Sequence, residues 1–218
     1  MDRLKGVAEA HWLEETRVIA ILRGVPIDSI VELAGALYKG GIRVLEITMN
    51  APDAPGAIAA LREKYGEKMW VGAGTVLDIE KAEIACKAGA QFYVTPNVDE
   101  AVIKFGLQNG IPSFTGALTP TEVVKAYKAG ASAVKIFPAS SVGAHYIKEL
   151  QGPLSDIPMM AVGGISADNA AEYIMAGCWG IGVGGTLVNR KAIDEKNFDS
   201  IRSYAEQLLK VVQEALSK

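Results

Sequence analysis

The sequence predicts a closed (β/α)8 barrel, built from residues 1–218 as a single domain with an added N-terminal helix near residues 3–16. Short apolar runs alternate strictly with amphipathic segments, a pattern typical of parallel strands joined by right-handed helical crossovers. The alternation produces eight strand and helix units, and 218 residues is near the lower size limit of such a barrel. Several units also share one plan, in which a helical pattern ends in Gly-Gly or Ala-Gly and a strand-like run follows.

The predicted strands are short apolar runs, as expected for parallel strands that are buried on both faces. They cover residues 18–22, 44–48, 69–74, 91–95, 112–116, 133–137, 159–163 and 180–184. The predicted helices cover residues 28–39, 53–65, 79–88, 98–109, 120–129, 143–151, 167–176 and 198–216. Small or polar residues end nearly every strand, which favours a barrel over the alternative of an open doubly wound sheet with one or two dominant glycine-rich turns.

The helix at 120–129 begins with a recognisable local signal, the segment "TPTE". Thr119 is expected to be the N-cap, Pro120 the first helical residue and Glu122 the acid of a capping box. These roles explain the segment without any catalytic function, although Thr119 also faces the end of the barrel where active sites form.

Composition and charge exclude several classes of function. Half of the residues are hydrophobic and the net charge is −3, which argues against a surface for nucleic acid or anionic membranes. No window approaches the roughly 18 apolar residues of a membrane span, and the N-terminus lacks the apolar core of a signal peptide. Cys86 and Cys178 lie outside metal-binding and CxxC spacings, so we expect reduced thiols in a cytoplasmic protein.

Two ionisable residues, Glu46 and Lys135, interrupt otherwise apolar strands near the ends where barrel active sites form. Burial lowers the pKa of a lysine, and a neutral amine can attack a carbonyl to form a Schiff base. The protonated Schiff base withdraws electrons, so a neighbouring carbon–carbon bond can break if a second group moves protons. Glu46 is the candidate for this proton transfer, and Arg23, at the end of the first strand, could supply local positive charge. The structural alternative is a buried ion pair inside the barrel.

The loops after the last two strands each contain a pair of glycines followed by a hydroxyl residue. Gly163 and Gly164 precede Ser166, and Gly184 and Gly185 precede Thr186. Many barrels hold a phosphate in these two loops, because backbone N–H groups can approach an anion closely there. The alternative is that the glycines only form tight turns.

These residues resemble a known family, the class I aldolases of 2-keto-3-deoxy-6-phosphogluconate (KDPG) and 4-hydroxy-2-oxoglutarate (KHG). The resemblance extends from "VIAILRG" to "GGTLV", and its most specific segments are "VLEIT", "VGAGTVL", "FYVTPN" and "VKIFPAS". "AVGGIS" and "GVGGT" match more loosely.

The resemblance implies that Lys135 forms the Schiff base and that Glu46 is the general acid and base, acting through water. It also implies that Arg23 and Thr75 lie in the substrate pocket, with Thr75 helping to hold the substrate carboxylate. Pro96 and Phe137 would shape this pocket, and the phosphate would rest on Gly163, Gly164, Gly184, Gly185 and Thr186, the last where the family often has serine. Members of the family are usually homotrimers and need no metal, so no cofactor is expected.

Two positions depart from the gluconate-type pattern. Asn50 stands where those members usually have an arginine that binds the substrate carboxylate, and Val162 stands where they tend to have threonine. Both residues look more like the 6-phosphogalactonate branch, whose substrate is the C4 epimer. The residue that holds the carboxylate and the preferred epimer therefore stay open.

The leading interpretation is a lyase that cleaves a 2-keto-3-deoxy-6-phospho sugar acid to pyruvate and D-glyceraldehyde 3-phosphate. It could also cleave 4-hydroxy-2-oxoglutarate to pyruvate and glyoxylate. One alternative is a phosphate-binding barrel isomerase or decarboxylase that uses Lys135 only as an acid or base. A third interpretation, a protein that only binds sugar phosphates, does not need a carboxylate and an amine in apolar strands.

Overall fold

The computed structural model of the protein describes residue 4 and residues 7–218. In this part of the chain the strands close into one parallel barrel in sequence order, so the predicted fold is confirmed. The strands are β1 (Val18–Leu22), β2 (Val44–Thr48), β3 (Trp70–Gly74), β4 (Tyr93–Val94), β5 (Ser113–Ala117), β6 (Ala133–Ile136), β7 (Met159–Val162) and β8 (Gly180–Val183).

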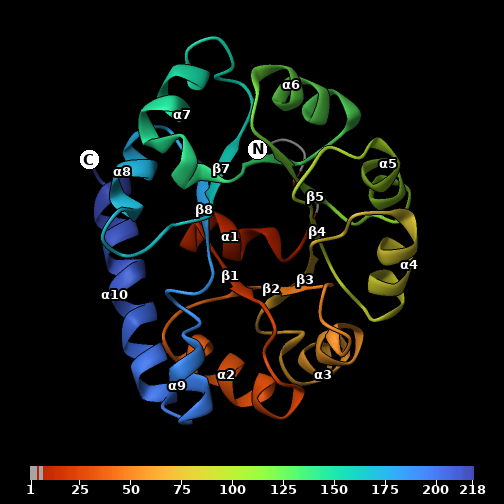
Figure 1. Cartoon of the computed structure of the whole chain (residues 1–218), viewed down its shortest axis with the longest axis vertical. Coiled ribbons are helices and arrows are strands. Elements are labelled where there is room, and N and C mark those ends of the chain that lie inside the picture. The colour runs from red at the N-terminus through yellow and green to blue at the C-terminus, as the bar shows by residue number, and fades with distance from the viewer. Residues whose placement is uncertain (1–3, 5–6) are drawn as a thin grey trace.

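The main helices form a ring around the strands (Figure 1). They are α2 (Ile27–Lys39), α3 (Ala54–Tyr65), α4 (Ile79–Lys87), α5 (Glu100–Gln108), α6 (Pro120–Ala129), α7 (Gly143–Gln151), α8 (Ala170–Met175) and α10 (Phe198–Leu216). The capping box at the start of α6 is present as predicted: Thr119 Oγ1 accepts from the Glu122 backbone N–H, and the Glu122 carboxylate accepts from the Thr119 N–H. None of the helices in the described residues has the length and apolar character that a membrane span requires.

The structure differs from the sequence-based prediction in its short elements. β4 spans only two residues, whereas the prediction covered 91–95. A 3₁₀ turn at Ala139–Ser141 and a five-residue helix, α9 (Arg190–Asp194), were not predicted, because neither is long enough for a periodic pattern. The N-terminal helix, α1 (Ala10–Thr16), is shorter than the predicted range of 3–16, of which residues 3, 5 and 6 lie outside the described residues.

The interior of the barrel is filled at one end by aromatic rings. Trp70, Phe92 and Phe114 are fully buried, and their ring centroids lie 4.7 to 5.9 Å apart. Leu13 of α1 belongs to the same buried cluster, and α1 lies across the centre of the ring of helices in Figure 1. This packing closes the end of the barrel at which the strands begin.

Towards the carboxyl ends of the strands, the inward-facing positions become small. Glu46 is opposite Gly72 of β3, and Lys135 is opposite Gly116 of β5. A methyl group on Gly74 would overlap the Glu46 carboxylate, so glycine leaves the space that this side chain occupies. Aromatic rings at one end and glycines at the other therefore leave room for two long ionisable side chains inside the barrel.

Candidate active site

Glu46 and Lys135 are both buried in the barrel, as their positions in apolar strands predicted. Their exposed fractions are 2% for Glu46 and 4% for Lys135. Along β2 and β6 the neighbouring residues on both sides, such as Leu45 and Ile136, belong to the core between the strands and the outer helices. Because successive side chains of a strand point to opposite faces, Glu46 and Lys135 point into the barrel. The Lys135 Nζ atom lies 4.8 Å from the centroid of the Phe137 ring.

Burial shifts the pKa values of the two groups in opposite directions. Loss of hydration raises the pKa of Glu46, and the positive charges of Lys135 and Arg23 counteract this increase. Loss of hydration lowers the pKa of Lys135; the negative charge of Glu46 opposes that decrease and the positive charge of Arg23 adds to it. Lys135 therefore has a larger fraction of neutral, nucleophilic amine at neutral pH than an exposed lysine.

The alternative of a structural ion pair receives no support from direct contact. The ion pairs between described side chains do not include one between Glu46 and Lys135. The two groups influence each other's pKa through space, as coupled acid and base groups in a shared site do.

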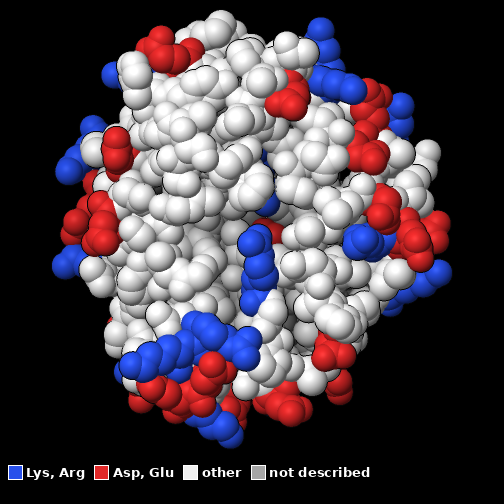
Figure 2. Space-filling view, viewed as in Figure 1, with Lys and Arg blue, Asp and Glu red and all other residues white. Residues whose placement is uncertain are grey.

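A cavity of about 520 Å³ lies at the ends of β1, β6, β7 and β8. Figure 2 shows acidic and basic side chains meeting at the centre of the ring, while most other charges on this face lie towards its edge. The cavity brings together many of the residues that the sequence singled out: Arg23, Phe137, Val162, Gly163, Gly164, Gly184, Gly185 and Thr186. Phe137 connects the two parts of the site, because its ring lines the cavity and also contacts Lys135.

The glycine pair after β7 has a backbone that other residues would not adopt easily. Gly163 has φ of 99° and Gly164 has φ of 73°, and a side chain on Gly164 would overlap Ser140. Gly185 differs, because a Cβ atom there would meet no other atom within 4 Å. Thr186 Oγ1 donates a hydrogen bond to the Ile165 carbonyl at 2.9 Å, so this hydroxyl joins the two glycine loops.

The catalytic pair Glu46 and Lys135 does not line this cavity, and neither do three predicted pocket residues: Thr75, Pro96 and Asn50. Thr75 follows Gly74, whose Cα faces the Glu46 carboxylate. The φ angle of Thr75 is 56°. Such a backbone is a strained outlier for a β-branched residue, and outliers of this kind cluster at functional sites. Pro96 packs against Gly116, the residue opposite Lys135, and Asn50 is exposed just after β2.

Several cavity residues were not predicted. Ile21, Gly182 and Val188 supply apolar walls, and Arg190 of α9 supplies a cation. Gly182 could have been recognised, because inward-facing positions alternate along β8; Arg190 carried no signal, since its place depends on a loop and a helix of five residues.

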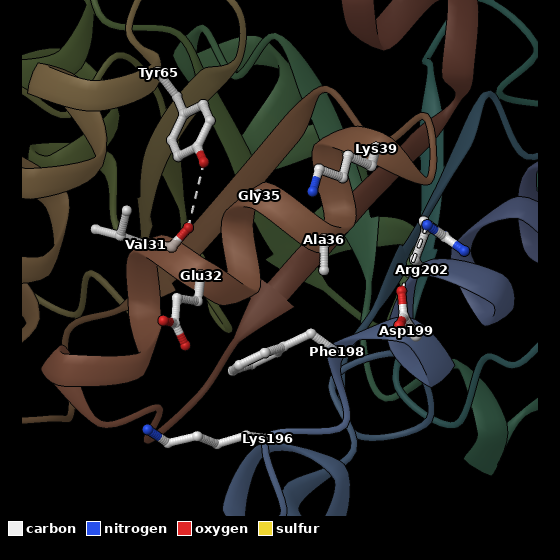
Figure 3. A pocket seen from close by; sticks show the side chains of 10 residues that line it. All are labelled: Val31, Glu32, Gly35, Ala36, Lys39, Tyr65, Lys196, Phe198, Asp199 and Arg202. Atoms are coloured by element: carbon white, nitrogen blue, oxygen red, sulfur yellow. Dashed lines mark hydrogen bonds and ion pairs between the residues drawn. The ribbon is translucent and has the colours of Figure 1, made fainter.

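A second cavity, of about 480 Å³, lies between α2 and the start of α10 (Figure 3). Tyr65 donates a hydrogen bond to the Val31 carbonyl at its edge, and Arg202 pairs with Asp199. None of the site residues predicted from the sequence lines this cavity, and it lies on the outer surface of the barrel. We therefore assign it no part in the chemistry.

Comparisons with known proteins agree with this geometry. A family model described as KDPG and KHG aldolase matches residues 10–204. The chain is 37% identical over 204 residues to a 2-dehydro-3-deoxy-6-phosphogalactonate aldolase of Escherichia coli K12, which covers 93% of this chain and 100% of the relative. It is 36% identical over 208 residues to a 2-dehydro-3-deoxy-phosphogluconate aldolase of Treponema pallidum, with 92% and 95% covered.

Solved structures give the same result. A structure described as native KDPGal has a TM-score of 0.86 and 37% identity, and the match covers 92% of this chain and 96% of that one. A KDPG aldolase from Legionella pneumophila, with pyruvate captured as a covalent carbinolamine intermediate, has a TM-score of 0.85 and 27% identity, with 90% and 96% covered. These relatives do not favour the isomerase or decarboxylase alternative. The chain therefore belongs to the KDPG and KHG aldolase family and is a lyase of the Schiff-base class.

Proposed function

We propose that this enzyme cleaves 2-keto-3-deoxy-6-phospho sugar acids, of the galactonate or the gluconate series, to pyruvate and D-glyceraldehyde 3-phosphate. The observation that carries the proposal is a lysine buried to 4% exposure whose neighbour Phe137 lines a cavity with two glycine pairs. 4-Hydroxy-2-oxoglutarate has the same 2-keto acid group and would be cleaved to pyruvate and glyoxylate.

In the proposed mechanism, the neutral Lys135 amine attacks the C2 carbonyl, and loss of water gives a protonated Schiff base. Glu46 then removes the proton from the C4 hydroxyl as the C3–C4 bond breaks. The bonding electrons move into the Schiff base to form an enamine, and the aldehyde product leaves. Glu46 returns the proton to C3, and water hydrolyses the Schiff base to release pyruvate and the Lys135 amine.

Proton transfer through a bound water fits the surroundings of Glu46. Thr48 lies two positions along β2 and so faces the same side of the strand, and it is fully buried. Its Oγ1 atom has no hydrogen-bond partner among the described residues. A buried hydroxyl without a protein partner is well suited to hold a water molecule, which could then contact the Glu46 carboxylate.

For the two charged ends of the substrate we propose different partners. The phosphate rests on the backbone of Gly163, Gly164, Gly184 and Gly185, with Thr186 fixing the relative position of the two loops. Arg23 and Thr75 hold the carboxylate, with Pro96 shaping that side of the pocket. Asn50 cannot supply the charge of the arginine that gluconate-type members usually have, which leaves Arg23 as the proposed cation.

We also propose that the enzyme is a homotrimer in the cytoplasm. Large apolar side chains are exposed on neighbouring helices, with Leu77, Ile79 and Ile84 at α4 and Leu107 on α5. Clustered exposed apolar side chains of this kind are common at protein interfaces. Cys86 and Cys178 are both free thiols, as in reducing compartments.

The assembly is tested by light scattering on the full chain in reducing buffer. We expect a mass of three times the 23.1 kDa chain. A monomer at micromolar concentration would contradict the trimer.

Replacing Lys135 tests the nucleophile. Lys135→Ala should abolish cleavage, and Lys135→Arg should fail as well, because a guanidinium stays charged and is a poor nucleophile. Borohydride added with pyruvate should attach a pyruvate-derived mass to Lys135, which peptide mass spectrometry locates. Lys104→Ala, an exposed lysine on α5, is the matched control and should keep full activity. Labelling of any other lysine would overturn the assignment.

Gly74→Ala tests whether the position of the Glu46 carboxylate matters. The three atoms nearest to the added methyl group all belong to the side chain of Glu46, which can move, so the barrel should fold while the carboxylate is displaced. Positioned acid–base groups typically contribute about 10²–10⁴-fold, so turnover should fall on that order, as it should in Glu46→Gln. Trapping of pyruvate at Lys135 should persist in both variants. Gly152→Ala is the control, because a methyl group there makes only ordinary van der Waals contacts. Normal turnover in Gly74→Ala would contradict the proposed proton path.

Val162→Thr tests the choice of epimer. Val162 lines the cavity beside the phosphate glycines, and threonine would add a hydroxyl that can bond one face of the substrate. One such hydrogen bond should shift the ratio of kcat/KM for the two epimers about threefold to tenfold towards gluconate. Val188→Thr, on another wall of the cavity, is the control. An unchanged ratio, or a wild type that cleaves only the gluconate epimer, would show that Val162 does not select the epimer.

A further inference from the structure

Arg190, the first residue of α9, lines the same cavity as the two glycine pairs. It follows Gly185 by five positions, so one connection after β8 supplies both a glycine pair and a cation. Among the described residues that line the cavity, only Arg23 and Arg190 carry positive charge. No part of the mechanism above uses Arg190.

The guanidinium of Arg190 is held on two sides. Its Nε donates to both carboxylate oxygens of Asp194, at 2.9 and 3.2 Å, and its Nη1 donates to the Gly24 carbonyl at 3.1 Å. These bonds fix the planar group between α9 and the loop that follows β1. In the described part of the chain, Nη2 takes part in none of them, so its two N–H groups can donate to another acceptor.

The two cavity cations differ in what they influence. The charge of Arg23 acts on both Glu46 and Lys135, which places its effect at the reacting groups. Arg190 is not among the charges that shift either pKa, and it belongs to the connection that carries Gly184, Gly185 and Thr186. The part of the cavity proposed for the phosphate would otherwise offer mainly neutral N–H donors to a group that carries nearly two negative charges at neutral pH.

We propose that Arg190 binds the substrate phosphate and sets the preference of the enzyme for phosphorylated over unphosphorylated 2-keto acids. This proposal rests on the placement of the phosphate at the two glycine pairs. Asp194 and the Gly24 carbonyl act as positioning groups that hold the guanidinium edge towards the cavity, and a planar fork of N–H donors suits phosphate oxygens. Because the Arg190 side chain is 65% exposed, water and salt weaken the interaction compared with a buried pair.

The test compares Arg190→Gln with Lys191→Gln. The two residues are adjacent on α9, and each substitution removes one positive charge. Lys191 differs from Arg190 because it is 81% exposed, pairs with Glu195 and does not line the cavity. In Arg190→Gln, kcat/KM for the phosphorylated sugar acid should fall roughly fivefold to thirtyfold, mainly through a higher KM. The rate of pyruvate trapping by borohydride, which involves no phosphate, reports whether the Lys135 site itself is damaged. Arg190→Lys should recover part of the loss, because it restores the charge without the fork.

The outcomes separate this proposal from the one on which it rests. Gly185 lines the cavity and a Cβ atom there would meet no other atom within 4 Å, so Gly185→Asp, which adds a negative charge at this position, should raise the KM for the phosphorylated substrate if the phosphate binds there. A large effect of Gly185→Asp with no effect of Arg190→Gln would overturn the role of Arg190 alone. No effect of either variant would overturn the phosphate placement as well. Equal losses in Arg190→Gln and Lys191→Gln, or an equal loss in pyruvate trapping, would also reject a specific phosphate contact.

Discussion

The burial of Glu46 and Lys135 inside one barrel is the constraint on which the rest of the site depends. Removing either group from water disfavours its charged form, so the pKa of Glu46 rises and that of Lys135 falls. Each group also acts on the other, because the charge of Lys135 lowers the pKa of Glu46 and the charge of Glu46 raises that of Lys135. The protonation states that the chemistry needs are therefore linked through the same two residues.

The side chains inside the barrel are large where the strands begin and small towards the carboxyl ends of the strands, and this arrangement makes the burial possible. Trp70, Phe92 and Phe114 fill the end at which the strands begin, and α1 packs beneath them. Higher in the barrel, Gly74 and Gly182 replace side chains that would collide with Glu46 and Val162. The large rings exclude water at the end where the strands begin, and the glycines leave room for a substrate at the carboxyl ends. The same strands therefore provide both a packed core and an open pocket.

The sequence predicted the parts of this structure that depend on the spacing of apolar residues and on charged residues within apolar strands. The alternation of apolar runs and helices gave the barrel, and a charge within an apolar run identified Glu46 and Lys135. It did not predict α9 and Arg190, because a five-residue helix carries no periodic pattern. The left-handed backbone of Thr75 was also not predictable, since β-branched residues normally avoid that conformation and only the surrounding loops impose it.

Arg23 has a special position, because its charge changes both pKa values in the direction that the first chemical step needs. It lowers the pKa of Glu46 and of Lys135, and so favours a charged carboxylate beside a neutral amine. In that state Glu46 can act as a base and Lys135 as a nucleophile. With a protonated carboxyl group and an ammonium group, neither residue could act in this way. Arg23 also lines the cavity, where an anionic substrate would neutralise part of its charge. Substrate binding would then weaken the effect of Arg23 on both pKa values, so its push towards a neutral amine and a charged carboxylate is strongest before the substrate binds.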